Sequence, residues 1–99
     1  MKKIYIFLLL LFNTTLAQKY NITGFIGDKE TSKPLSYANI RIDGTTNGVT
    51  SNYDGQFTLK LHTGDYKLIF SYVGYKTDTA LVSVPQNNKI NIYLQPVAV

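Results

Sequence analysis

After residue 17, apolar and polar side chains alternate with a period of two, and Gly, Pro, Asn and Asp recur at short intervals between the alternating stretches. A half-buried β-strand produces this alternation because successive side chains point to opposite faces of a sheet. No apolar stripe with the period of a helix continues through three turns. The pattern therefore predicts an all-β chain without a helix of consequence.

The alternation predicts about seven short strands, over residues 20–27, 35–42, 49–51, 56–61, 65–73, 76–84 and 90–94. Asp54-Gly55 gives the strongest hairpin signal, because this dipeptide suits a tight turn between strands. Residues 65–73 have apolar side chains on both faces, which predicts a central strand, and Gly74 is expected to interrupt it as a bulge or bend. The intervals leave no room for crossover helices. The expected fold is therefore an antiparallel Greek-key β-sandwich of about seven strands.

Residues 1–17 have the pattern of a secretory signal peptide: Met1-Lys2-Lys3, nine apolar or aromatic residues at 4–12, and a small-residue site that ends at Ala17. The apolar run is too short for a helix that crosses a hydrocarbon core of roughly 30 Å. We therefore expect cleavage after Ala17 and export of the chain. Residues 18–99 are then expected to form one domain without a transmembrane segment.

The composition argues against several classes of active site. The absence of Cys removes disulfides, thiolate metal sites and a lipidated Cys. His62 is the only His, whereas a catalytic zinc site needs three protein ligands. Residues 52–55 resemble the start of a calcium loop, but Leu61 stands where a bidentate carboxylate is required. We therefore expect no enzyme, no catalytic residue, no metal and no cofactor.

The charges are dispersed. Ten basic and six acidic residues give a formal charge of +4, and after residue 17 the basic residues are spread singly among the acids. This distribution is typical of a solvated surface and predicts no nucleic-acid partner. Most of the carboxylates fall in or next to predicted turns, where Asp bonds its own backbone, so a role in turn formation is expected.

The tyrosines are the candidate contact residues. Tyr53 in the predicted hairpin turn, together with Tyr37, Tyr75 and Tyr93, is predicted to form an exposed surface for a partner protein or a glycan. A phenol ring suits both because it combines an apolar face with a polar tip. Scattered surface aromatics that bind nothing are the alternative.

Seven short segments follow one another in a characteristic order: Gly24 with Ile26, Pro34-Leu35, Ala38-Asn39-Ile40, Gly44-Thr45, Asp54-Gly55-Gln56-Phe57, Gly64-Asp65-Tyr66 and Ser71-Tyr72-Val73-Gly74-Tyr75. In this order and spacing they resemble the carboxypeptidase regulatory-like (CarboxypepD_reg-like) domain, a transthyretin-like seven-stranded sandwich. The resemblance covers residues 20 to 95.

The resemblance implies a non-catalytic exported module, like the periplasmic N-terminal extension of TonB-dependent outer-membrane receptors in Bacteroidetes-type bacteria. A protein partner at the outer membrane or in the periplasm is then expected. Since 99 residues cannot supply a receptor's plug and barrel, the chain is expected to be a fragment or a free-standing copy. Three alternatives remain: a carbohydrate-binding module that uses exposed tyrosines, a regulatory domain attached to a zinc carboxypeptidase, and a fully secreted protein.

Overall fold

The computed structural model describes residues 18–97, which form seven strands and no helix. The strands are β1 (Lys19–Asp28), β2 (Asn39–Ile42), β3 (Gly48–Thr50), β4 (Gln56–His62), β5 (Gly64–Ser71), β6 (Asp78–Val84) and β7 (Lys89–Leu94). Among these residues there is accordingly no helix that could span a membrane. The predicted signal peptide at 1–17 lies outside the described residues.

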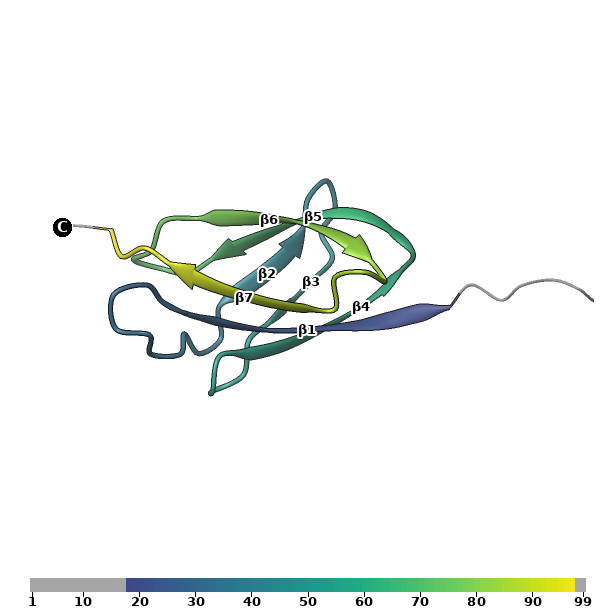
Figure 1. Ribbon diagram of the computed structural model, residues 1–99. Helices are drawn as coiled ribbons and strands as arrows, with labels where there is room; N and C mark the ends of the chain where they lie inside the picture. The colour runs from purple at the N-terminus through teal and green to yellow at the C-terminus, as the bar shows by residue number, and fades with distance from the viewer. Residues whose placement is uncertain (1–17, 98–99) are drawn as a thin grey trace, which may run out of the picture.

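The strands form two sheets that pack face to face (Figure 1), a three-stranded sheet in the order β4-β1-β7 and a four-stranded sheet in the order β3-β2-β5-β6. This arrangement confirms the predicted all-β sandwich. One pair differs from the antiparallel pattern, because β7 runs parallel to β1, with Gly24 opposite Ile90. The alternation of a strand fixes which side chains face the core, but not the direction of its neighbour.

β2 is shorter than predicted, because residues 35–38 form a turn instead of a strand. The hydroxyl of Ser51, which is 1% exposed, takes the place of ladder bonds here. It donates to the carbonyl of Leu35 at 2.6 Å and accepts the backbone N–H of Ala38 at 2.9 Å. Leu35 and Ala38 are nevertheless buried, as their apolar character requires.

β5 lies between β2 and β6 and is the central strand that the sequence predicts. Leu68 and Phe70 on its inner face are fully buried, and Ile69 on its outer face is half-buried. The strand ends in a turn in which the N–H of Tyr75 donates to the carbonyl of Tyr72 at 3.0 Å. Gly74 has a φ of 87° in this turn, a conformation that favours glycine. The predicted interruption at Gly74 is confirmed.

The core consists of the inward-facing side chains of both sheets, which are Ile22, Ile26, Leu35, Ala38, Ile40, Phe57, Leu59, Leu61, Leu68, Phe70, Val82, Val84 and Leu94. Phe57 of one sheet and Phe70 of the other meet with ring centroids 5.8 Å apart. Each large apolar side chain in this core contributes about 1.5–3 kcal/mol of burial free energy. The two sheets therefore form a rigid support from which the loops project.

Candidate functional site

The described residues do not assemble a metal centre. Among residues 18–97 there is no group of three or more His, Asp or Glu side chains that could hold a metal ion. His62 is exposed at the end of β4, and its Nδ1 lies 3.3 Å from the carbonyl of Gln18. Since a general base needs a positioned partner as well as a reacting group, this arrangement does not build one.

The segment that resembles a calcium loop is an ordinary turn. Oδ1 of Asn52 accepts the N–H groups of Asp54 and Gln56, both at 2.9 Å. The side chain that would act as a cation ligand is therefore used to close the turn. Leu61 points into the core with 6% of its surface exposed.

Asp28 is the one buried carboxylate among the described residues, with 8% of its surface exposed. Its Oδ1 accepts the N–H groups of Glu30 at 2.7 Å and Thr31 at 2.9 Å, which shapes the turn after β1. Its Oδ2 accepts the hydroxyl of Tyr75 at 2.5 Å. The carboxylate thus has the turn-forming role that the sequence predicts, and in addition it holds a distant segment.

The Asp28–Tyr75 contact changes the pKa of both groups. The hydrogen bond from Tyr75, followed by the backbone N–H of Thr31, lowers the pKa of Asp28 below its usual value. The same bond, with burial as the next cause, raises the pKa of Tyr75 to about 12. Both shifts favour a carboxylate that accepts and a phenol that donates. The bond itself links the end of β1 to the segment before β6.

Tyr37 and Tyr53 lie on two loops that the structure brings together. The hydroxyl of Ser36 donates to the carbonyl of Tyr53, and the N–H of Tyr37 donates to the carbonyl of Ser51. The two tyrosine side chains are 65% and 73% exposed. This end of the sandwich therefore carries two exposed rings on joined loops.

Tyr75 and Tyr93 have different surroundings. Tyr75 is half-buried, bonded to Asp28 and packed against Tyr72 with ring centroids 5.6 Å apart. Tyr93 is on the outer face of β7, 43% exposed, with its ring centroid 5.8 Å from that of Phe25. Sequence reasoning did not single out Phe25, which could be found only from the register of β1 with β7.

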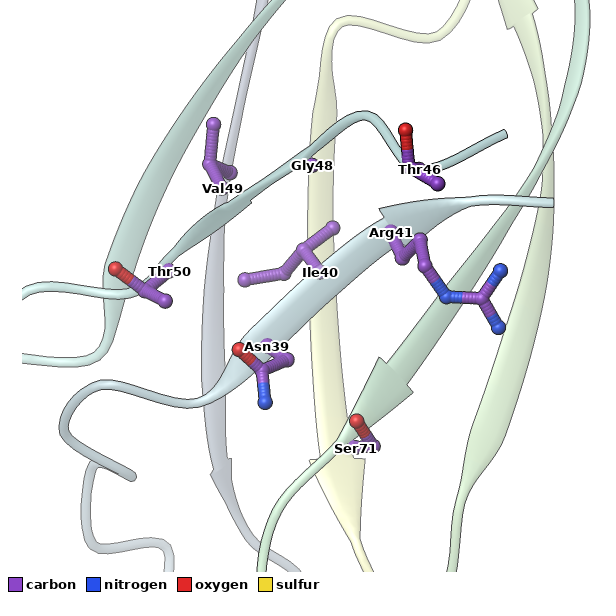
Figure 2. Close-up of a pocket in the computed structure, with 8 residues that line it drawn as sticks. All are labelled: Asn39, Ile40, Arg41, Thr46, Gly48, Val49, Thr50 and Ser71. Carbon is purple, nitrogen blue, oxygen red and sulfur yellow. The ribbon is translucent and has the colours of Figure 1, made fainter.

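A hollow of about 520 Å³ lies on the outer face of the four-stranded sheet (Figure 2). Thr46, Gly48 and Thr50 line one side of the hollow, and Arg41 and Asn39 come from the neighbouring strand. Its polar groups are hydroxyls, an amide and a guanidinium. These groups can form hydrogen bonds to a ligand, but the hollow contains no carboxylate or imidazole that could act as a base.

Comparison with known proteins gives a family and a set of relatives. The family model described as the CarboxypepD_reg-like domain matches residues 22–98. The chain is 32% identical over 92 residues to TonB-dependent receptor P3 of Formosa agariphila, which is 93% of this chain and 9% of the receptor. It is 32% identical over 71 residues to TonB-dependent receptor SusC of Bacteroides thetaiotaomicron, covering 72% of this chain and 7% of the receptor. The chain therefore spans less than a tenth of the length of these receptors.

Two solved structures have a similar fold. A protein of unknown function from Bacteroides fragilis gives a TM-score of 0.63 at 23% identity, covering 86% of this chain and 30% of the other. A DUF3823 family protein from Bacteroides ovatus gives a TM-score of 0.58 at 23% identity, covering 79% and 45%. At this identity the likeness concerns the fold alone.

Proposed function

Because this chain belongs to the CarboxypepD_reg-like domain family, we propose that it is a non-catalytic exported module that acts through protein contacts. Its setting would be that of the periplasmic extension of a TonB-dependent outer-membrane receptor, or of a free-standing copy of that extension. The similarity to two receptors, of which it matches a small part, supports this setting. A contact role requires no metal site, and none is assembled by His, Asp or Glu side chains among residues 18–97.

The distribution of exposed apolar side chains carries the proposal. The loops β1–β2, β3–β4 and β5–β6 lie at the same end of the sandwich as the C-terminal residues (Figure 1). We call this the loop end and define it as residues 29–38, 51–55, 72–77 and 95–97. Four of the six large apolar side chains that are exposed among the described residues belong to it: Tyr37, Tyr53, Val73 and Val97. Apolar groups gathered at one place on a surface are typical of a contact site.

Two of the edge strands, β4 and β6, are partly closed by hydrogen bonds within the chain. On β6 the backbone N–H of Ser83 donates to the side chain of Asn87 at 2.8 Å, and its carbonyl accepts the N–H of Asn87 at 2.7 Å. On β4, Gln56 forms the equivalent pair of bonds with Asn52. These bonds shorten the edge that an added strand could use. We therefore place the partner at the loop end.

A photo-crosslinking amino acid at Tyr53 tests this proposal. The variant is expressed in a Gram-negative host that exports the chain, next to a control with the crosslinker at Thr46 in the β2–β3 turn. We expect a discrete adduct from Tyr53, weakened by Tyr37→Ala, and none from Thr46. N-terminal sequencing of the periplasmic protein should begin at Gln18. Equal labelling from both positions, or a protein that stays in the cytoplasm, would contradict the proposal.

A second candidate is a glycan-binding module that uses Tyr37 and Tyr53, which the joined loops of the loop end favour. The chain has no Trp, so its fluorescence reports on tyrosine. Quenching by a glycan that disappears in Tyr53→Ala would support this candidate, and flat titrations across neutral glycans would contradict it. A zinc peptidase encoded after the codon for Val99 would instead favour the third candidate, a regulatory domain attached to a carboxypeptidase.

A further inference from the structure

The outer face of the three-stranded sheet has a composition unlike the rest of the surface. This face, which we call the lysine face, comprises the odd-numbered residues of β1 and β7 and the even-numbered residues of β4, opposite in side to the buried core residues. It includes Lys19, Lys60 and Lys89 and contains no Asp or Glu. The outer face of the other sheet, by contrast, places Asp65 on the same strand as Lys67. The positive charge on the lysine face is therefore not balanced locally.

The strand register arranges the lysine face in rows. The backbone of Phe25 stands between Gln56 on β4 and Asn91 on β7, and its ring extends along the strand toward Gly27 and Tyr93. In the next row Thr23 stands between Thr58 and Lys89. A hollow of about 490 Å³ lies over these two rows.

The ring of Phe25 is held against the sheet. A Cβ added at Gly27 would come within 2.6 Å of the Phe25 ring, so this ring covers the glycine. The ring also packs beside Tyr93, with centroids 5.8 Å apart at an angle of 54°. Phe25 is half-buried, and its neighbours Gln56, Asn91 and Tyr93 are exposed. A fixed ring with one side toward solvent costs little further entropy on binding a flat apolar surface.

We propose that the lysine face binds an acidic polysaccharide, one that carries carboxylate or sulfate groups. The C–H face of a sugar would lie on Phe25, the amides of Gln56 and Asn91 would bond its hydroxyls, and Lys60 and Lys89 would pair with its acidic groups. Neighbouring strands lie about 4.8 Å apart, so the two lysines, one on each side of β1, lie roughly 10 Å apart or more and can contact successive sugars. This site is separate from the loop end and does not depend on the protein-contact proposal.

The chemistry of the lysine face favours a polysaccharide over a single-stranded nucleic acid. Proteins that bind single strands stack successive bases on separate rings. Here the two rings pack against each other, which leaves one platform, and the amide residues Gln56 and Asn91 stand opposite Phe25 on the neighbouring strands. Amides that can both donate and accept suit the hydroxyls of a sugar.

Affinity electrophoresis of the purified protein through gels that contain alginate or heparin tests the proposal, with dextran as the neutral polymer. We expect retardation by alginate and heparin that weakens as salt rises, and none by dextran. Lys60→Gln with Lys89→Gln should weaken binding about tenfold. Lys67→Gln with Lys76→Gln removes the same charge outside the lysine face and should leave binding close to that of the wild type.

A second pair of variants tests the ring and the amides. Phe25→Leu should weaken binding about fivefold, whereas Tyr53→Leu at the loop end should not. Because Phe25 also covers Gly27, Asn91→Ala provides a variant of an exposed side chain that leaves the ring in place, and it too should weaken binding. The proposal would be overturned if both lysine pairs lost binding equally, or if Phe25→Leu and Asn91→Ala bound like the wild type. Tighter binding of an oligo-dT strand, or no retardation at all, would also overturn it.

Discussion

The hydroxyl of Tyr75 donates a hydrogen bond of 2.5 Å to Oδ2 of Asp28, and this contact joins the end of β1 to the segment before β6. The two residues are 47 positions apart in the sequence. The same segment also holds the C-terminal residues, because the carbonyl of Gly74 accepts the N–H of Val97 at 3.0 Å and the N–H of Lys76 donates to Gln95 at 2.8 Å. The loop end is thus fastened across both sheets.

Removal of the Tyr75 hydroxyl should destabilise the protein. Tyr75→Phe keeps the ring contact with Tyr72 but leaves Oδ2 of Asp28 without this donor. We expect the free energy of unfolding to fall by about 1 kcal/mol, measured by urea denaturation. Tyr53→Phe is the matched control, because that ring is 73% exposed, and it should unfold like the wild type. An equal loss in both variants would show that the Asp28 contact contributes nothing specific.

Acid should act on the same contact. The folded pKa of Asp28 lies below its usual 3.8, so its stabilising contribution is fully present above that value and is lost as the pH falls through the lowered pKa. Tyr75→Phe removes the largest cause of the lowering. The acid unfolding transition, followed by circular dichroism, should therefore begin at higher pH in the variant. Superimposable acid transitions would contradict this prediction.

The titration of the Tyr75 phenol should be observable at high pH. Its folded pKa of about 12 lies above the usual 10.0, so the contribution of the protonated phenol is fully present below pH 10 and is lost as the pH rises through about 12. An absorbance titration of phenolate should contain a component with a midpoint near 12. This component should be missing from the titration of Tyr75→Phe, and its persistence there would assign it to another tyrosine.

The hydroxyl of Ser51 should contribute more to the free energy of unfolding than an exposed serine hydroxyl does. Ser51→Ala leaves the carbonyl of Leu35 and the N–H of Ala38 without the partner that replaces their ladder bonds. Because these groups are buried, we expect a loss of about 1–3 kcal/mol in the free energy of unfolding. Ser83→Ala removes a bond to the exposed Asp65 and should cost far less. Similar costs in the two variants would mean that water satisfies the buried groups.

Two leucines on neighbouring strands allow a buried and an exposed side chain of the same type to be compared. Leu68 on β5 is fully buried, whereas Leu81 on β6 is 84% exposed. Leu68→Ala should cost about 2–5 kcal/mol through lost burial and the cavity that remains, and Leu81→Ala should leave the midpoint of thermal unfolding nearly unchanged. A large loss from Leu81→Ala would instead show that this side chain is covered, for example by a second copy.

Much of the sandwich could be predicted from the alternation. The central position of the fifth strand followed from apolar side chains on both of its faces, and Leu68 and Ile69 lie where that pattern places them. The length of β2 could not be predicted, because the apolar residues Leu35 and Ala38 suit a strand, whereas the Ser51 hydroxyl, 13 to 16 positions away, bonds the Leu35 carbonyl and the Ala38 N–H. A side chain that replaces a ladder leaves no periodic mark in the sequence.

The candidate sites were less accessible to prediction. Tyr37 and Tyr53 are exposed on joined loops, whereas Tyr75 became the partner of Asp28, which no local pattern indicates. The role of Tyr93 and the others in binding stays a prediction. The lysine face could not be predicted from the sequence, because its rows combine residues of three strands. Gln56 and Asn91 stand opposite Phe25 only through the register of β1 with β4 and β7.

The sequence by itself determined which side chains of the strands face the core, where most of the turns lie and which family the chain belongs to, because these properties depend on residue type and local spacing. Only the tertiary structure decided that β7 lies parallel to β1, that Asp28 meets Tyr75, and that lysines, amides and a ring share one uncovered face. Those features depend on which strands become neighbours, and neighbours are chosen by the packing of the whole core, which no single strand encodes.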